Sequence, residues 1–181
     1  MEKRIFGRTG LEISLLTFGC GAVGGLMTKG TSHDQDRAVD WARDNGINHF
    51  DTAPSYGDTV SESNLGRALG RNRSDIIVST KIGLSKDELK DIQGATQKSL
   101  EASLKRLRQD HVDIFQLHNT LDDATASDSI SLQQVINDVL PVEFVRQDTI
   151  SFLSFSVDGF SLSDNFFAHL SYVFVLTELA V

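Results

Sequence analysis

The sequence predicts an α/β fold built from parallel strands and intervening helices. Short apolar runs that suit buried strands recur along the chain, and each is followed by a loop and then by a segment with helical periodicity. The unit repeats at intervals of about thirty residues, which indicates parallel strands joined by right-handed crossovers. With 181 residues, 40% of them hydrophobic, the chain can bury one sizeable core, so a single domain over residues 1–181 is expected.

Two features precede the first helix. Residues 3–14 contain two short extended stretches on either side of a turn at 7–10, whose glycines tolerate positive φ, so we expect a hairpin. Residues 15–19 form a short apolar run closed by glycine and are predicted to be the first strand. The glycine-rich loop that follows lacks the full dinucleotide-binding fingerprint and opens no immediate helix, so it does not indicate a Rossmann site.

The next helix, strand and helix are indicated by their periodicity and their ends. Residues 34–45 carry apolar side chains on one helical face and are followed by a glycine where a C-cap belongs. Residues 47–52 are predicted to form a buried strand. Thr59 and Glu62 have the spacing of a capping box, which predicts that a helix begins there and continues to Gly70.

Two further strands flank a longer helix. Residues 76–81 open with a β-branched run suited to a strand that is buried on both faces. Leu100, Leu104 and Leu107 form an i, i+4, i+7 stripe, which predicts an amphipathic helix. Residues 112–117 are predicted to be the fourth strand of the sheet.

The C-terminal third departs from this pattern. Residues 130–145 are predicted to form a helix interrupted by proline, and residues 150–157 a fifth strand. All 17 Lys and Arg residues lie at or before Arg146, whereas six of the 11 Phe residues follow residue 149. Residues 158–181 therefore read as an atypical hydrophobic tail after a more regular part at 1–157. Either a helix over 163–180 or a poorly ordered, aberrant tail fits this composition.

Composition limits the classes of partner and compartment. The net charge of −8 and pI near 5.0 argue against binding to nucleic acid or anionic lipid, both of which need clustered positive charge. Cys20 is the only cysteine, which rules out an internal disulfide and four-thiolate metal sites, and the histidines show no ligand spacing, so no metal is expected. The sequence shows neither a signal peptide nor an apolar run of the roughly 20 residues that a membrane span needs, so we expect a cytoplasmic location.

Four polar residues stand where a parallel sheet would bring them together. Asp51, Lys81 and His118 each follow the apolar part of a predicted strand, and Tyr56 lies in the loop just beyond Asp51. Because parallel strands end at the same rim, where α/β folds keep their active sites, we expect the four side chains to meet. Singly, such residues are more often turn formers, packing residues or solvated charges, but their joint order favours a site. Cys20 is expected to be a packing residue.

The chemistry of carbonyl reduction explains this combination. A proton must reach the carbonyl oxygen as hydride reaches carbon, and a phenol, whose pKa is ordinarily near 10, gives up its proton reluctantly. An ammonium from Lys81 beside the phenol of Tyr56 would favour phenolate, and Asp51 would hold that ammonium charged and in place. A neutral His118 would orient the carbonyl and donate a hydrogen bond to its oxygen.

At these residues the chain resembles the aldo-keto reductase family, whose members carry an Asp, Tyr, Lys and His tetrad on a (β/α)8 barrel and use NADPH or, less often, NADH. The agreement extends over roughly two-thirds of the chain. This form of the motifs is similar to bacterial and plant sugar or aldehyde oxidoreductases more than to hydroxysteroid enzymes. The matching segments are Gly7-Arg8-Thr9-Gly10-Leu11-Glu12-Ile13-Ser14, Phe50-Asp51-Thr52-Ala53-Pro54-Ser55-Tyr56-Gly57, Ser61-Glu62 to Leu65-Gly66, Ser79-Thr80-Lys81, and Ser99-Leu100 to Val112-Asp113-Ile114-Phe115-Gln116-Leu117-His118.

The resemblance implies roles and limits for the cofactor site. It places Cys20 and Gly21 near the nicotinamide, with Asp51, and matches Ser156 to the serine that contacts the carboxamide. Family members hold the adenosine phosphate with a Lys or Arg near a Ser- or Asn-containing run close to the C-terminus, and no such run follows Arg146 here. Val157, next to Ser156, stands where many family members have an asparagine, so nicotinamide positioning is also expected to differ from the family pattern.

A complete barrel of this kind takes about 250 residues, so we expect about the first five βα units, that is, a C-terminally truncated or aberrant partial barrel with an N-terminal hairpin. The resemblance implies reduction of aldehydes or ketones, or oxidation of the corresponding alcohols or sugars, with small carbonyl or sugar substrates. The alternative is an inactive half-barrel that serves as a binding or interaction module. Its open sheet edge is expected to favour self-association.

Overall fold

A single open sheet carries most of the structure. The computed structural model describes residues 1–7, 9–70, 74–121, 129–130, 151–152 and 173–175. Its largest sheet has six strands in the order β3-β4-β5-β6-β10-β9. The first four of these strands pair in parallel, as the sequence predicts; they are β3 (Thr17–Gly19), β4 (His49–Asp51), β5 (Ile77–Ile82) and β6 (Ile114–Leu117).

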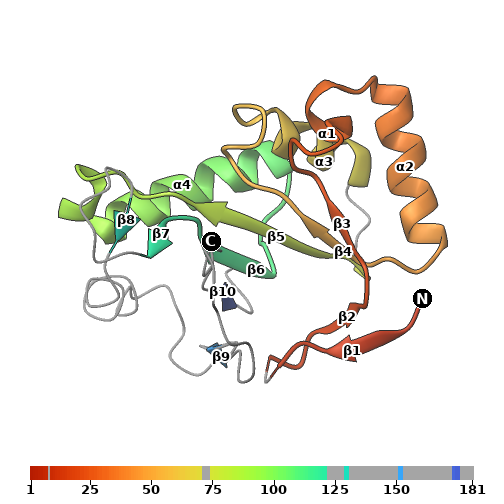
Figure 1. The fold of residues 1–181 in the computed structure, drawn as a ribbon, viewed down its shortest axis with the longest axis horizontal. Coiled ribbons are helices and arrows are strands. Elements are labelled where there is room, and N and C mark those ends of the chain that lie inside the picture. The colour runs from red at the N-terminus through yellow and green to blue at the C-terminus, as the bar shows by residue number, and fades with distance from the viewer. Residues whose placement is uncertain (8, 71–73, 122–128, 131–150, 153–172, 176–181) are drawn as a thin grey trace, which may run out of the picture.

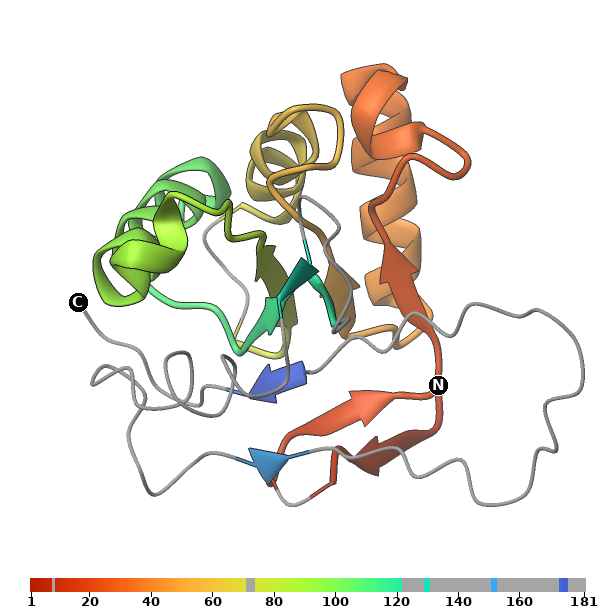
Figure 2. The ribbon, with the colours of Figure 1, turned by 60° about the vertical axis from the view of Figure 1, so that its left-hand side comes forward.

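Helices α2 (Ser32–Asp44), α3 (Val60–Leu69) and α4 (Ile92–Leu107) cover one face of this sheet (Figure 1 and Figure 2). Between them and the strands lies the main hydrophobic core, in which Phe50 of β4 and Val78 of β5 are fully buried. The short helix α1 and the 3-10 helix η1 lie in the loops that lead into this layer. Their bounds are α1 (Leu26–Lys29) and η1 (Glu88–Lys90).

The opposite face of the sheet, called the inner face below, is covered at one end by the predicted hairpin. Its strands, β1 (Lys3–Ile5) and β2 (Glu12–Ser14), pair antiparallel. Figure 2 shows the hairpin on the side of the sheet away from the helices. Apolar side chains that include Phe6 pack there against Ile77 and Ile114, so the hairpin closes the end of the inner face at which β5 and β6 begin.

The ends of two helices test the capping expectations. At the end of α2, Gly46 adopts φ 78°, the left-handed conformation expected after a helix C-terminus. The capping box at the start of α3 is wrong: Thr59 has φ 70° and its side chain makes no capping bond. Glu62 is instead fully buried and accepts hydrogen bonds from Thr80 and Arg106, because a buried carboxylate needs partners more than the helix end needs a cap.

The C-terminal part agrees less well with expectation. Of the strand predicted over residues 150–157, the structure describes only β9 (Ser151–Phe152), and the other six residues lie outside the described ranges. In the sheet, β10 (Val173–Val175) lies between β9 and β6 and pairs antiparallel with both. A helix over 163–180 is therefore wrong at β10. Two short parallel strands, β7 (Thr120–Leu121) and β8 (Ser129–Ile130), follow β6. Ile130 thus belongs to a strand, and residues 131–145 of the predicted helix, with the rest of the tail, lie outside the described residues. Within the described ranges, no helix is long and apolar enough to cross a membrane.

Candidate active site

An ion pair between neighbouring strands forms the base of the site. Asp51 ends β4 and Lys81 lies near the end of β5, so both side chains reach the rim where the parallel strands finish. The Lys81 Nζ donates to both Asp51 carboxylate oxygens, at 2.8 Å and 2.7 Å, and to the carbonyl oxygen of Thr52 at 2.8 Å. The side chain of Lys81 is 9% exposed and that of Asp51 25%. The ammonium is therefore fixed by three acceptors and shielded from water.

Tyr56 stands beside this ammonium. Its ring centroid is 4.9 Å from the Lys81 Nζ. The loop that carries Tyr56 is tightly folded: the backbone N–H of Tyr56 donates to the carbonyl of Ala53, and Gly57 adopts φ 63°. A Cβ on Gly57 would approach the side chain of Thr28 to 2.9 Å, so this loop packs closely against α1. The phenol is thus held near Lys81 by local backbone geometry.

His118 completes the group from the next strand. It follows β6, and its backbone N–H donates to the carbonyl of Ile82 at 2.7 Å. Its ring meets the Tyr56 ring edge to face, with centroids 5.9 Å apart and an interplanar angle of 83°. Its Nδ1 lies 3.4 Å from the Ser55 hydroxyl. Desolvation of the ring and the nearby Lys81 ammonium lower the pKa of His118 below 6.5, which favours the neutral imidazole at neutral pH.

The expected nicotinamide residues lie in different surroundings. Cys20 is 1% exposed, and burial, with the Asp51 carboxylate next, raises the pKa of its thiol to about 12. Its backbone N–H donates to the carbonyl of Asp51 at 2.8 Å. A Cβ on Gly21 would lie 3.7 Å from the Tyr56 ring, so this residue borders the phenol directly. Ser156 lies outside the described residues.

Two polar residues that the sequence did not single out join the site from below. The Ser79 hydroxyl donates to the Asp51 Oδ1 at 2.7 Å, and the Ser79 Oγ lies 3.1 Å from the Nε2 of His49. The available signal was alternation along a strand: His49 and Asp51, like Ser79 and Lys81, are two residues apart and so share a face. Within the described part of the chain, no cluster of three or more His, Cys, Asp or Glu residues could hold a metal ion.

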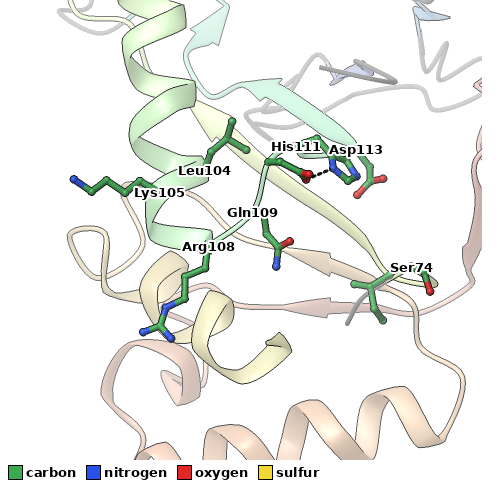
Figure 3. A pocket seen from close by; sticks show the side chains of 9 residues that line it. Ser74, Leu104, Lys105, Arg108, Gln109, His111 and Asp113 are labelled. Atoms are coloured by element: carbon green, nitrogen blue, oxygen red, sulfur yellow. Dashed lines mark hydrogen bonds and ion pairs between the residues drawn. The ribbon is translucent and has the colours of Figure 1, made fainter. Parts of the chain in front are cut away.

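The structure also has a cavity of about 720 Å³ away from this group (Figure 3). It is lined by residues that include Ser74, Arg108 and Asp113. Ser74 precedes β5 and Asp113 precedes β6, so the cavity lies where these strands begin. His111, which also lines it, lies 2.7 Å through its Nδ1 from the Asp110 carboxylate. Lys81 and His118 lie at the opposite ends of β5 and β6, so this cavity is not part of the site that they form with Asp51 and Tyr56.

Comparison with known proteins supports a family assignment. Residues 15–153 match the sequence profile described as "Aldo/keto reductase family". Over 144 residues the chain is 37% identical to L-galactose dehydrogenase of Arabidopsis thaliana, a match that covers 78% of this chain and 43% of that enzyme.

Solved structures show the same relationship. The holo form of the aldo-keto reductase AKR11C1 from Bacillus halodurans aligns with a TM-score of 0.55 and 32% identity, covering 65% of this chain and 40% of that one. An aldo-keto reductase from Klebsiella pneumoniae in complex with NADPH aligns with a TM-score of 0.54 and 22% identity, over 67% of this chain and 41% of that one, and shows likeness of fold. The chain thus spans less than half the length of each of these relatives. The predicted fold, a partial (β/α)8 barrel with an N-terminal hairpin, is confirmed.

Proposed function

Because the chain belongs to the aldo/keto reductase family, we propose that it transfers hydride between a nicotinamide cofactor and a small carbonyl compound. The cofactor is NADPH, with NADH as the second choice, and the substrate is an aldehyde or ketone, or in reverse an alcohol or sugar. The Arabidopsis relative is named for oxidation of a sugar, so aldoses are the first substrates to try. Asp51, Tyr56, Lys81 and His118 are the proposed catalytic residues.

One observation carries the proposal. The Lys81 ammonium, held by both oxygens of Asp51, lies 4.9 Å from the Tyr56 ring, and that ring meets His118 edge to face. A phenol, an ammonium and a neutral imidazole gathered at one rim are the groups needed to give a proton to a carbonyl oxygen. A structural ion pair alone would not need the phenol and the imidazole at the same rim.

Each of these residues has a separate role in the reduction. The hydroxyl of Tyr56 donates its proton to the substrate oxygen while the carbonyl carbon accepts hydride. The carbonyl π bond breaks, the C–O single bond remains, and one C–H and one O–H bond form. The Tyr56 phenolate that remains is stabilised by the Lys81 ammonium and regains a proton from solvent. Neutral His118 donates a hydrogen bond to the substrate oxygen as negative charge builds on it. A bound reduced nicotinamide supplies the hydride.

The described residues fit the nicotinamide end of such a cofactor. Gly21 borders the Tyr56 ring and leaves there the space that a side chain would fill. We infer that Gly21 and the backbone beside Cys20 face the nicotinamide, with Ser156 as the proposed carboxamide contact. The side chain of Cys20 is buried in the hydrophobic core, so its thiol would not contact the cofactor.

The test combines binding with turnover. The purified chain is titrated with NADPH while nicotinamide fluorescence is followed, and reduction of an aldehyde panel is then measured at 340 nm. Tyr56→Phe should bind NADPH as the parent chain does and lose turnover, because the phenol acts in the transition state. Lys81→Met should also lose turnover, whereas Lys86→Met, at an exposed lysine, serves as the matched control. The reverse direction is assayed with aldoses and NADP⁺ or NAD⁺. A folded chain that binds neither NADPH nor NADH, reduces no aldehyde and oxidises no aldose would refute the proposal.

A second candidate function is an interaction module without catalysis. Among the described strands, β3 forms one edge of the large sheet and pairs with β4 alone. Leu15 and Leu16, which precede it, are more than half exposed, and Trp41 on α2 is 64% exposed. An apolar margin beside a strand edge is suited to self-association. Sedimentation across a concentration series, with Leu16→Lys as the variant, would show whether this margin joins copies of the chain.

A further inference from the structure

A continuous chain of hydrogen bonds runs across the inner face beneath the tetrad. Thr17 of β3 lies 2.9 Å through its Oγ1 from the Nδ1 of His49, whose Nε2 is 3.1 Å from the Ser79 Oγ. The Ser79 hydroxyl then donates to the Asp51 Oδ1 at 2.7 Å. These contacts link three adjacent strands, β3, β4 and β5, and end on the carboxylate that holds Lys81.

Strand register accounts for the chain. Thr17 pairs with His49, and Asp51 pairs with Ser79. Side chains two residues apart on a strand point to the same face, so His49 and Asp51 both project inward, with Ser79 between them on the neighbouring strand. His49 and Ser79 are buried, and a buried polar group without a partner would cost about 1–3 kcal/mol. The hydrogen bonds of His49 and Ser79 therefore contribute to the stability of the fold.

Counting protons fixes the direction of every bond. The Asp51 carboxylate, paired with an ammonium, only accepts, so the single hydroxyl proton of Ser79 is used on Asp51. The Ser79 oxygen can then only accept from His49, which requires a proton on Nε2. In a neutral ring this leaves Nδ1 as the acceptor for the Thr17 hydroxyl. Burial, the largest effect, lowers the pKa of His49, which is consistent with a neutral imidazole.

We propose that Ser79 and His49 are positioning residues that hold the Asp51 carboxylate in the orientation which fixes Lys81 beside Tyr56. The effect of these residues on turnover rests on the proposed function, whereas the chain of hydrogen bonds itself does not. Of the two Asp51 oxygens, Oδ1 accepts hydrogen bonds from both Ser79 and Lys81. The bond from Ser79 therefore fixes the rotation of the carboxylate about the Cβ–Cγ bond of Asp51. Without that bond the carboxylate can turn, and the ammonium can move with it away from the phenol.

The first test determines which ring nitrogen of His49 carries the proton. Long-range ¹H–¹⁵N correlation of histidine rings at neutral pH distinguishes the two neutral tautomers and the imidazolium. We expect His49 to be the Nε2–H tautomer, and the exposed His33 serves as an internal reference. Ser79→Ala should change the His49 ring shifts, since Nε2–H loses its acceptor. An Nδ1–H ring or an imidazolium in the parent chain would overturn the relay, whether or not the chain is an enzyme.

The second test separates positioning from folding. Ser79→Ala should lower kcat about ten-fold, since a hydrogen bond to a charged group is worth about that factor, while NADPH affinity stays the same. His49→Gln places an amide N–H near the position of Nε2, whereas His49→Asn does not, so Gln should retain more kcat than Asn. Ser85→Ala, which removes an exposed hydroxyl that donates to Glu88, is the matched control.

The outcomes of the two tests separate the two proposals. Unchanged kcat in Ser79→Ala, or equal kcat in the two His49 variants, would overturn positioning in an active chain. A parent chain without NADPH binding or turnover would refute the proposed function, and the tautomer would still decide whether the relay exists.

Discussion

The Asp51–Lys81 pair allows a prediction in which the two partners are not equivalent. Lys81 is nearly buried, with a side chain 9% exposed, and two of the three hydrogen bonds of its Nζ go to Asp51. Asp51 is 25% exposed and keeps the hydroxyl of Ser79 as a donor if Lys81 is removed. Removing the carboxylate should therefore cost more stability than removing the ammonium.

The magnitudes follow from burial. Breaking a buried ion pair on one side costs about 3–5 kcal/mol, because a charge is left unpaired in a low-dielectric site. Asp51→Asn should cost about 3 kcal/mol, the low end, since the amide oxygen still accepts one hydrogen bond from Lys81. Lys81→Met leaves the Asp51 carboxylate hydrogen-bonded to Ser79 and to water, so this substitution should lower the unfolding free energy by about 1 kcal/mol. For a chain of this size these values correspond to decreases in Tm of about 6–12 °C and about 2–4 °C.

The measurement is urea denaturation followed by circular dichroism at 222 nm for the parent chain, Asp51→Asn, Lys81→Met and the double variant. The double variant should be more stable than Asp51→Asn alone, because it no longer buries an unpaired ammonium. If Lys81→Met proved as destabilising as Asp51→Asn, or if the double variant were the least stable, the unequal burial of the two partners would not govern the pair.

Three further outcomes are expected. Because burial lowers the pKa of His49, the unfolded chain binds a proton below about pH 6.5 that the folded chain does not, so unfolding free energy should fall as pH decreases there and His49→Gln should reduce that slope. A Cβ on Gly66 would lie 2.5 Å from the backbone of Leu107, so Gly66→Ala should cost about 1–3 kcal/mol in thermal melts, whereas Gly83→Ala, with open space around it, should be close to neutral. Cys20, buried and with a thiol pKa of about 12, should react with iodoacetamide at neutral pH only after denaturant is added.

Local sequence signals were sufficient for the parallel part of the fold. The sequence predicts strands over residues 47–52 and 76–81. In the structure β4 lies within the first range, and β5 overlaps the second with both ends shifted by one residue. Once strands are parallel, the residue after each apolar run must lie at a common rim, which is why Asp51, Lys81 and His118 could be grouped without any distance. Tyr56 followed because its loop is short and begins at Asp51.

Predictions failed where distant residues decide the outcome. Thr59 and Glu62 have the spacing of a capping box, but Glu62 accepts hydrogen bonds from Thr80 and Arg106, which are 18 and 44 residues away in the sequence. No local pattern announces such partners. The antiparallel insertion of β10 beside β6 is likewise a long-range choice, since an apolar run of three residues fits a strand or a helix equally well. The positions of Cys20 and Gly21 relative to a cofactor, and of Ser156, remain predictions.

The inner face of the sheet carries apolar, neutral polar and charged side chains. This combination explains how the Asp51–Lys81 pair can be largely buried and still lie at the rim where the strands end. Ile77 and Ile114 form an apolar layer that the hairpin closes off from water. Next to them lie two neutral polar side chains, His49 in register with Ile77 and Ser79 in register with Ile114 and Asp51, whose hydrogen bonds lead to Asp51. A charged pair set directly on the apolar layer would pay the full desolvation penalty, and one open to water would be screened. The neutral His49 and Ser79 side chains supply dipoles oriented toward the carboxylate without adding a competing charge, which helps to hold the ammonium beside Tyr56.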